Sequence, residues 1–184
     1  MAHADADALR ACLDDGVARL EPLTEGHREA LRAACAIDRA TWDNYRWSFL
    51  DPHFDTSFEA ARDGAGRTVF AAFAAGHLVG MTGFINIMAM NRALEIGLTY
   101  LVPAARGTGV NRRFKDLLLD HAFASGFSRV EFRVDGRNAR SQAAMTKLGA
   151  VREGTLRKDV PIWNGYVRDT VVYSILRDEW RKDR

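Results

Sequence analysis

The sequence predicts an α+β (or α/β) fold, in which helices flank one sheet of mixed strand direction. A hairpin pattern comes first, a strand–helix–strand unit follows over residues 94–134, and a further helix and two strands close the chain. A strand–helix–strand connection makes its two strands parallel, whereas hairpins make neighbours antiparallel. With 184 residues and 47% hydrophobic content, the chain can build one complete core, and no linker or repeat divides it. We expect a single domain over residues 1–184.

The N-terminal part begins with a short strand and a helix. Val17–Leu20 reads as a strand that stops at a Glu-Pro turn, and helical spacing of apolar residues follows over Thr24–Cys35. The next segment, Ile37–Phe58, is rich in aromatic residues, but its periodicity is mixed and Pro52 interrupts it. It predicts short helices and loops.

Three strands are expected in the middle of the chain. Thr68–Ala74 and Leu78–Ile87 are apolar runs joined by an Ala-Gly turn, which is typical of an antiparallel hairpin. Leu94–Val102 is the third strand, and it ends at Pro103 because proline has no N–H to donate to a ladder.

The C-terminal half alternates helices and strands. Asn111–Ser125 has apolar residues at helical spacing and a glycine stop, and Val130–Val134 alternates as a strand does. Asn138–Leu148 predicts a second helix that ends at a glycine. The last two strands cover roughly Val151–Arg157 and Arg168–Leu176.

Composition and charge exclude several classes of function. The 26 basic and 24 acidic residues give a net charge of +2, far from the basic surface that nucleic acid requires. No apolar run is long enough to span a membrane, and the N-terminus lacks the pattern of a signal peptide. Cys12 and Cys35 fit neither a metal site nor a disulfide framework, and the histidines lack ligand spacing. We therefore expect a cytoplasmic protein that uses no metal.

The segment Arg106-Gly107-Thr108-Gly109-Val110-Asn111 combines the features that bind phosphate. It lies between a strand that ends at Val102 and a helix, so glycines and the free N–H groups of a helix N-terminus come together. Arg106 adds a cation beside them. The spacing fits neither a P-loop nor a Rossmann dinucleotide loop.

This loop resembles the Arg/Gln-x-x-Gly-x-Gly/Ala signature of the GNAT superfamily of N-acyltransferases, with Arg106, Gly109 and Asn111 at the defined positions. Asn111 departs from the usual glycine or alanine, yet it keeps the backbone N–H and suits a helix start. A second segment is also similar to the family: Asn138-Ala139-Arg140-Ser141, Leu148-Gly149-Ala150 and Glu153-Gly154. Together with residues 168–174, the match is closest to the RimJ/RimL-like branch, and it covers roughly residues 94–180.

The resemblance implies an N-acetyltransferase that takes its acetyl group from acetyl-CoA and passes it to an amine. It also implies that a central parallel pair of strands splays apart, in a mostly antiparallel sheet, and that the pantetheine arm lies in the gap. The expected cofactor contacts are the backbone of Thr99, Tyr100 and Leu101, the loop residues Arg106, Gly107, Thr108, Gly109, Val110 and Asn111, and Asn138, Ser141 and Lys147.

The catalytic candidates each have a plain alternative. Glu95 would take the proton of the amine, or it is a structural hydrogen-bond acceptor. Glu131 is the second candidate, although a solvated face or a pair with Arg133 explains it better. The tyrosine that donates the final proton in many family members is replaced by Met145. Ser141 then becomes the candidate donor, or the thiolate leaves directly to solvent.

Other side chains are compatible with either a ligand contact or a structural role. Arg140 and Lys147 would meet the 3′-phosphate of the nucleotide or belong to a solvated helix face. Three tryptophans would wall the acceptor cleft or fill a core; they are Trp42, Trp47 and Trp163. Asn138 is also a natural helix N-cap.

Three functional readings remain open from the sequence. The first is the N-acetyltransferase, the second is a non-catalytic acyl-CoA sensor, and the third is a general nucleotide-binding module. The sequence does not identify the amine acceptor, because a protein N-terminus and a small-molecule amine both fit. A homodimer is compatible with the family resemblance.

Overall fold

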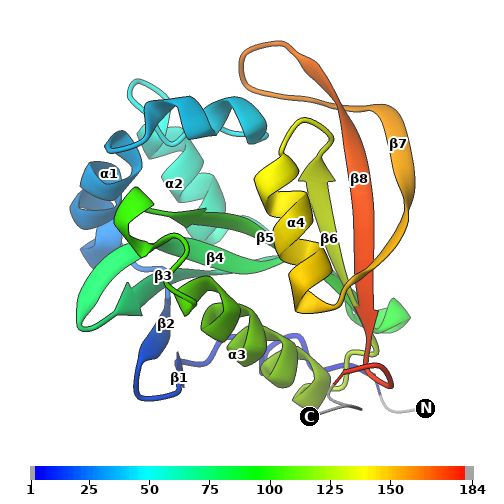
Figure 1. The fold of residues 1–184 in the computed structure, drawn as a ribbon. Helices are drawn as coiled ribbons and strands as arrows, with labels where there is room; N and C mark the ends of the chain where they lie inside the picture. Colours follow the sequence, from blue (N-terminus) through cyan, green and yellow to red (C-terminus); the bar gives the residue numbers. More distant parts are fainter. Residues whose placement is uncertain (1–2, 181–184) are drawn as a thin grey trace.

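The computed structural model describes residues 3–180, which form one eight-stranded sheet with helices on both faces (Figure 1). The strand order is β1-β2-β3-β4-β5-β6-β8-β7, and only β5 and β6 are parallel neighbours. The predicted α+β fold with a mixed, mostly antiparallel sheet is confirmed. The strands are β1 (Leu13–Asp14), β2 (Ala18–Pro22), β3 (Thr68–Ala74), β4 (His77–Met88), β5 (Ala93–Leu101), β6 (Arg129–Asp135), β7 (Val151–Pro161) and β8 (Val167–Leu176).

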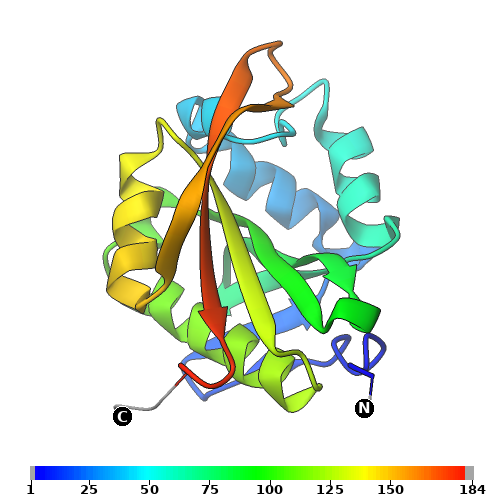
Figure 2. The same ribbon diagram turned by 90° about the vertical axis from the view of Figure 1, so that its right-hand side faces the viewer.

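Two pairs of helices cover opposite faces of this sheet. Helices α1 (Arg28–Ala36) and α2 (Phe54–Asp63) pack on one face, and α3 (Val110–Ala124) and α4 (Ala139–Leu148) pack on the other (Figures 1 and 2). Successive side chains of a strand point to opposite faces, so β3 sends Val69 to the core under α1 and α2, and Phe70 to the core under α3. Short 3₁₀ turns join these elements: η1 (Glu25–His27), η2 (Arg39–Asn44), η3 (Ala89–Asn91) and η4 (Pro103–Ala105).

The structure departs from the sequence expectation in three places. The aromatic segment ends in a full helix, α2, because Phe54, Phe58 and Ala61 recur at helical spacing and are all buried. The mixed aromatic pattern before them obscured this spacing. A two-residue strand, β1, was not predicted, and β7 extends to Pro161, beyond the predicted end. None of the helices within residues 3–180 has the length and apolarity that a membrane crossing requires.

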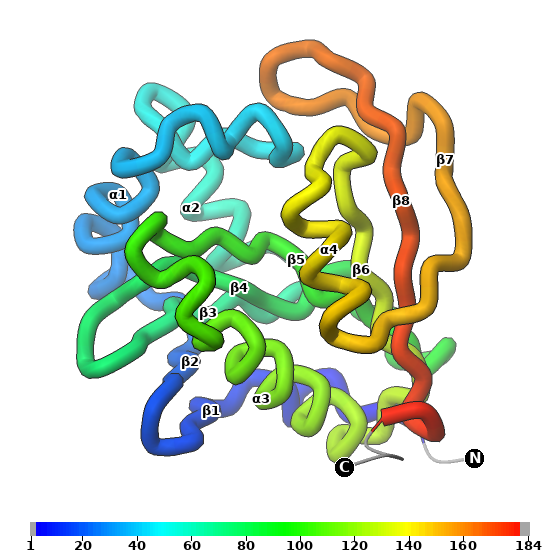
Figure 3. Tube along the Cα trace, viewed as in Figure 1, coloured from blue at the N-terminus to red at the C-terminus, as the bar shows by residue number. Residues whose placement is uncertain are grey.

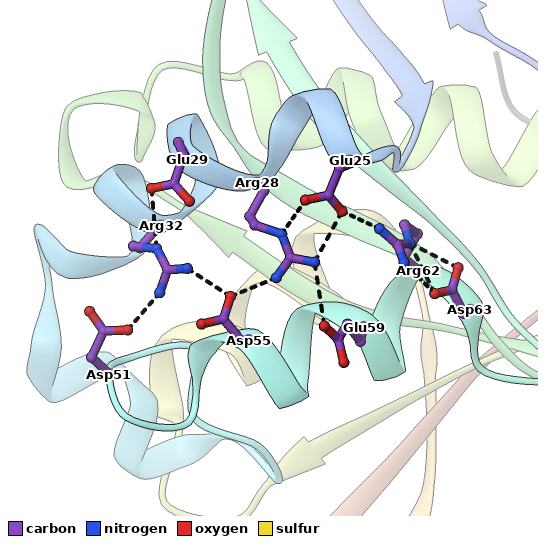
Figure 4. Close-up of polar contacts among 9 residues, drawn as sticks. All are labelled: Glu25, Arg28, Glu29, Arg32, Asp51, Asp55, Glu59, Arg62 and Asp63. Carbon is purple, nitrogen blue, oxygen red and sulfur yellow. Dashed lines mark hydrogen bonds and ion pairs between the residues drawn. The ribbon is translucent and has the colours of Figure 1, made fainter.

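An ion-pair network joins α1 to α2 (Figure 4). Arg28 and Arg32 both contact Asp55, at 2.6 and 2.7 Å. The same two guanidinium groups lie over the rings of Phe58 and Phe54, at 4.5 and 4.2 Å. Exposed ion pairs contribute little one by one, but here the arginine stems and planes also cover aromatic surface. The network thereby holds α1 against α2, the two helices that flank η2 and the segment after it in the chain.

Strands β5 and β6 pair only at their beginnings. The parallel ladder joins Ala93–Glu95 to Arg129–Glu131 and then stops, although both strands continue. Leu98 has a φ of 50°, and the β4–β5 register shifts at the same place, so a bulge bends β5. Beyond Glu95 the two strands run in different directions (Figure 3). The splayed parallel pair expected from the sequence is therefore present.

Lys115 of α3 is buried beneath this gap. Its Nζ donates to the Thr99 hydroxyl at 2.6 Å and lies 3.4 Å from the Thr82 hydroxyl. No carboxylate of residues 3–180 forms an ion pair with it. Burial without a counter-charge lowers the pKa of Lys115 from 10.5 to about 7, because the ammonium loses its hydration.

The pKa of Lys115 predicts a pH-dependent stability. Between about pH 7 and 10.5 the unfolded chain binds a proton at this side chain that the folded chain does not, so its contribution to the unfolding free energy rises with pH across that window and is constant below it. Urea unfolding of the wild type and of Lys115→Met at pH 6 to 10 should show the wild type gaining stability relative to the variant as pH increases. Parallel curves would contradict this.

Gly80 of β4 lies where β5 crosses closest. A Cβ there would fall 1.9 Å from the Tyr100 carbonyl oxygen, and the φ of Gly80 is 152°. We predict that Gly80→Ala lowers the unfolding free energy by about 3 kcal/mol, because the backbone of β4 or that of β5 must move to make room for the methyl group. Gly154→Ala in β7 is the matched control, since its Cβ meets nothing within 4 Å. Urea midpoints measure both, and equal shifts would refute the close contact.

Candidate active site

The gap between β5 and β6 holds a cavity of about 530 Å³. It begins at the loop after β5, passes between the two strands and reaches the segment before α2 and the far end of β4. The predicted site residues that line it are Glu95, Thr99, Leu101, Arg106, Gly107, Asn111, Asn138, Ser141 and Lys147. Residues separated by up to 52 positions in the sequence are thus brought to one cavity.

Tyr100 does not line this cavity, because it faces the other way. The Val102 N–H donates to the Val79 carbonyl of β4. Because the N–H groups of a strand alternate in direction, that of Tyr100 also faces β4, and those of Thr99 and Leu101 face the gap. The Tyr100 ring stacks on Trp42 at 4.8 Å, and its hydroxyl donates to the Ala34 carbonyl. Its side chain is part of the core under α1 and α2.

The loop before α3 borders the cavity at Gly107 and Asn111, whereas Thr108, Gly109 and Val110 do not line it. Gly107 and Gly109 have φ of 77° and 89°, and a Cβ at either would meet nothing within 4 Å. Among residues 3–180, no acceptor pairs with the N–H groups of Gly107, Thr108, Gly109 or Asn111. This donor set fits a diphosphate, since unpaired N–H groups and a helix N-terminus favour anions.

Arg106 holds the loop in place. Its Nε donates to the Leu101 carbonyl at 2.8 Å, and its Nη1 lies 2.5 Å from Asp38. The guanidinium therefore joins the end of β5, the segment after α1 and the loop. Asp38 balances part of the positive charge of Arg106. Arg106 therefore anchors the loop in addition to any contact that it makes with a phosphate. Val110, at the start of α3, is buried in the core, and Thr108 donates its hydroxyl to Ala105.

Asn138 caps α4, as expected for this position. Its Oδ1 accepts from the Ser141 N–H at 3.0 Å, and both residues line the cavity. Met145 fills a buried position of the same helix. Arg140 and Lys147 lie exposed at the cavity rim, where their charges are free to meet a phosphate.

Glu95 is a buried carboxyl group at the point where the two strands separate. Its side chain accepts a hydrogen bond from the Asn86 amide at 2.7 Å and lines the cavity. Burial raises the pKa of Glu95 from 4.5 to about 7, because a carboxylate is poorly stabilised away from water. A carboxyl group with this pKa exchanges protons readily at neutral pH.

Glu131 has a structural role, but its expected partner was wrong. It pairs with Arg129 of the same strand at 2.9 Å, whereas Arg133 pairs with Asp159 at 3.1 Å. Alternate residues of a strand share a face, and both Glu131–Arg129 and Glu131–Arg133 satisfy this rule. The choice depends on Asp159, which the β7–β8 hairpin brings to Arg133.

Sequence reasoning missed much of the other end of the cavity. Tyr45, Arg46 and Trp47 come from the segment between η2 and α2, Arg67 precedes β3, and Arg168 lies on β8. The Tyr45 hydroxyl donates to the Thr99 carbonyl at 2.5 Å. Of the three tryptophans considered, only Trp47 lines the cavity; Trp42 is core, and Trp163 donates to the Trp42 carbonyl.

Comparison with known proteins agrees with this geometry. Residues 18–151 match the family model of the acetyltransferase (GNAT) domain. A 110-residue stretch is 30% identical to "Putative ribosomal N-acetyltransferase YdaF" of Bacillus subtilis (strain 168), and this match covers 59% of each protein. The RimJ/RimL-like resemblance, whose branch includes ribosomal-protein N-acetyltransferases, is consistent with that relative.

Solved structures share the same architecture. A probable acetyltransferase of the GNAT family from Chromobacterium violaceum ATCC 12472 is 30% identical, with a TM-score of 0.87 over 93% of this chain and 88% of that one. A GCN5-related N-acetyltransferase from Brucella melitensis is 26% identical, with a TM-score of 0.83 over 93% and 80%. The splayed strands, the loop of free N–H groups and these matches together show that the chain belongs to the GNAT acetyltransferase family.

Proposed function

We propose that this chain is an acetyl-CoA-dependent N-acetyltransferase, organised as one domain, that acts on a primary amine. The donor and the amine would meet in the gap between β5 and β6 and react directly in a ternary complex. The observation that carries this proposal is one continuous cavity with unpaired backbone N–H groups at one end and the buried carboxyl of Glu95 at the other.

The dimensions of the gap support this arrangement. Leu101 lies six positions after Glu95, which corresponds to about 20 Å of extended strand. An extended pantetheine arm lying beside β5 would place its thioester near Glu95 when its diphosphate is at the loop. At the free edge of β5, the N–H groups of Thr99 and Leu101 can donate to such an arm, much as a sheet edge accepts an added strand.

Each remaining predicted contact has a proposed role. The N–H groups of the loop from Gly107 to Asn111 would bind the diphosphate, and Asn138 and Ser141 would bind the arm. Arg140 and Lys147 at the rim would meet the 3′-phosphate. Tyr100 would contribute through the shape of β5, because its ring is committed to the core.

The chemistry requires a neutral amine and a proton for the departing thiolate. Glu95 would accept a proton from the amine, directly or through water, as the nitrogen attacks the thioester carbonyl. The new carbon–nitrogen bond then forms and the carbon–sulfur bond breaks. The thiolate would receive a proton from Ser141 or from water.

A non-catalytic acyl-CoA sensor is the second candidate. The observation in its favour is the buried Met145 at the position of the usual tyrosine. Release of free thiol from acetyl-CoA with any acceptor amine distinguishes the two, because a sensor binds the cofactor without turnover.

The loop makes a prediction for cofactor affinity. In Gly107→Ala the new methyl group enters open space at a residue that lines the cavity, and it strains a residue at positive φ. We expect the dissociation constant of desulfo-coenzyme A, measured by calorimetry, to increase about tenfold or more, since one charge-assisted hydrogen bond contributes about 1.5–3 kcal/mol.

Gly165→Ala is the matched control for that variant. Gly165 also has a positive φ, 85°, and open space around its Cβ, but it lies in the β7–β8 turn and does not line the cavity. Its affinity for desulfo-coenzyme A should equal that of the wild type. If both variants bind equally well, the loop is not the diphosphate site.

Glu95 makes a prediction for the pH profile. The carboxyl is protonated below its pKa of about 7 and then no longer accepts a proton, so kcat/KM should fall below about pH 7. The assay should use an acceptor amine with a pKa below about 5, so that the amine stays neutral over the pH range in which Glu95 titrates. Glu95→Gln should lower kcat/KM about 100-fold and should remove the acid limb of the profile, which is the decrease below pH 7.

Lys115→Met is the control for the assignment, because Lys115 is the other buried group with a pKa near 7. The limb should persist in Lys115→Met. If the decrease in kcat/KM below pH 7 disappears in Lys115→Met and remains in Glu95→Gln, the titrating group is the lysine instead.

A further inference from the structure

The geometry points to an acceptor amine that also carries an anionic group, bound by Arg46, Arg67 and Arg168 at the Glu95 end of the cavity. This inference rests on the proposed function and names the class of its second substrate. The shared chemistry is a carboxylate or phosphate oxygen held close to the reacting amine.

The three arginines reach this end from three separate elements. Arg67 immediately precedes β3, beside the part of β4 that pairs with Glu95: the Ile87 N–H donates to the Gly66 carbonyl, and Ile85 is the register partner of Glu95. Arg168 lies on β8 opposite Val160 of β7. Arg46 belongs to the segment between η2 and α2, and all three line the cavity.

None of these arginines forms an ion pair within residues 3–180. The Arg67 Nε is buried without an acceptor in that part of the chain, and its Nη1 donates to the Ala60 carbonyl at 3.1 Å. Arg168 contacts only neutral oxygens, of Thr170 at 3.2 Å and Asn44 at 3.5 Å. Half-buried cations normally have an anionic partner, so Arg67 and Arg168 without one indicate a ligand that supplies it. Arg46 is exposed and adds positive charge beside them.

The charged groups nearby do not compensate for them. The carboxylate of Asp135 is held by Arg137 at 2.8 Å, and that of Asp159 by Arg133. Glu95 accepts from Asn86 and is only partly ionised at neutral pH. Burial, together with the charge of Arg46, lowers the pKa of Arg67. Burial also lowers the pKa of Arg168, and the charges of Asp135, Glu95 and Asp159 offset this only in part.

The phosphates of coenzyme A do not account for this cluster. The diphosphate loop lies at the opposite end of the gap, about 20 Å along β5 from Glu95. Arg106 of the loop and Lys147, whose carbonyl accepts from Arg112 of α3, are cations at that end. The guanidinium of Arg67 lies over the Trp47 ring at 4.8 Å and that of Arg46 at 5.9 Å, so one aromatic plane orients both. The cluster is positioned for a second ligand rather than for the donor.

Matched acceptor pairs test the inference through kcat/KM, measured as thiol release from acetyl-CoA. The pairs are a free amino acid and its amide, an Ala-Asp and an Ala-Asn N-terminal peptide, and phosphoethanolamine and ethanolamine. The anionic member of at least one pair should be preferred about tenfold or more, which is about 1.4 kcal/mol. The preferred pair identifies whether the anion is an α-carboxylate, an acidic side chain or a phosphate.

Variants then assign that preference to the cluster. Arg67→Gln and Arg168→Gln should each reduce the acid-to-neutral ratio of kcat/KM about tenfold, and Arg46→Glu should reverse the preference. Arg39→Gln is the control, because Arg39 is exposed in η2 and does not line the cavity. Its ratio should match the wild type, and all four variants should bind desulfo-coenzyme A normally.

Two failures are distinguishable. Turnover that shows no preference for the anionic member of any pair overturns this inference and leaves the proposed function standing. Cofactor binding without turnover of any amine overturns the proposed function, and the acceptor inference with it.

Discussion

The end of the β5–β6 ladder after Glu95 is the constraint on which the rest of the structure depends. A continuous parallel ladder would satisfy both strand edges and leave no room for a ligand. The bulge at Leu98 and the tight crossing at Gly80 bend β5 away, so a free strand edge and a 530 Å³ cavity appear together. The same separation leaves Glu95 and Lys115 buried near the cavity with pKa values near 7.

The two ends of the cavity are built differently. The end that we propose for the donor is built from backbone groups, since the loop before α3 and the free edge of β5 have N–H groups that any residue would supply. The end that we propose for the acceptor is built from side chains, because Tyr45, Trp47 and three arginines reach it from elements distant in sequence. A backbone site fixes one cofactor for a whole family, whereas a side-chain site changes with each substitution. This difference explains how one fold accepts many amines.

The donor end and most of the fold were predictable because their signals are local. Apolar runs joined by a turn identified β3 and β4, and alternating apolar residues identified β6. Glycine spacing identified the loop after β5, and Asn138 was expected at the N-cap of α4, where its side chain accepts from the Ser141 N–H. The aromatic segment before α2 gave no clear period, since its side chains pack against several elements at once. The helix α2 was therefore missed. The expected partner of Glu131 was wrong for another reason, because Asp159, which is distant in sequence, pairs with Arg133.

The sequence by itself determined the order of strands and helices, the glycine-containing loop before a helix and the family, because each depends on neighbouring residues and their periodicity. Only the tertiary structure decided that Tyr100 faces the core and that Glu95 is desolvated. It also brought Arg46, Arg67 and Arg168 from separate elements to the cavity that Glu95 lines. Burial and electrostatic environment arise from segments that meet only after folding, so no local pattern contains them.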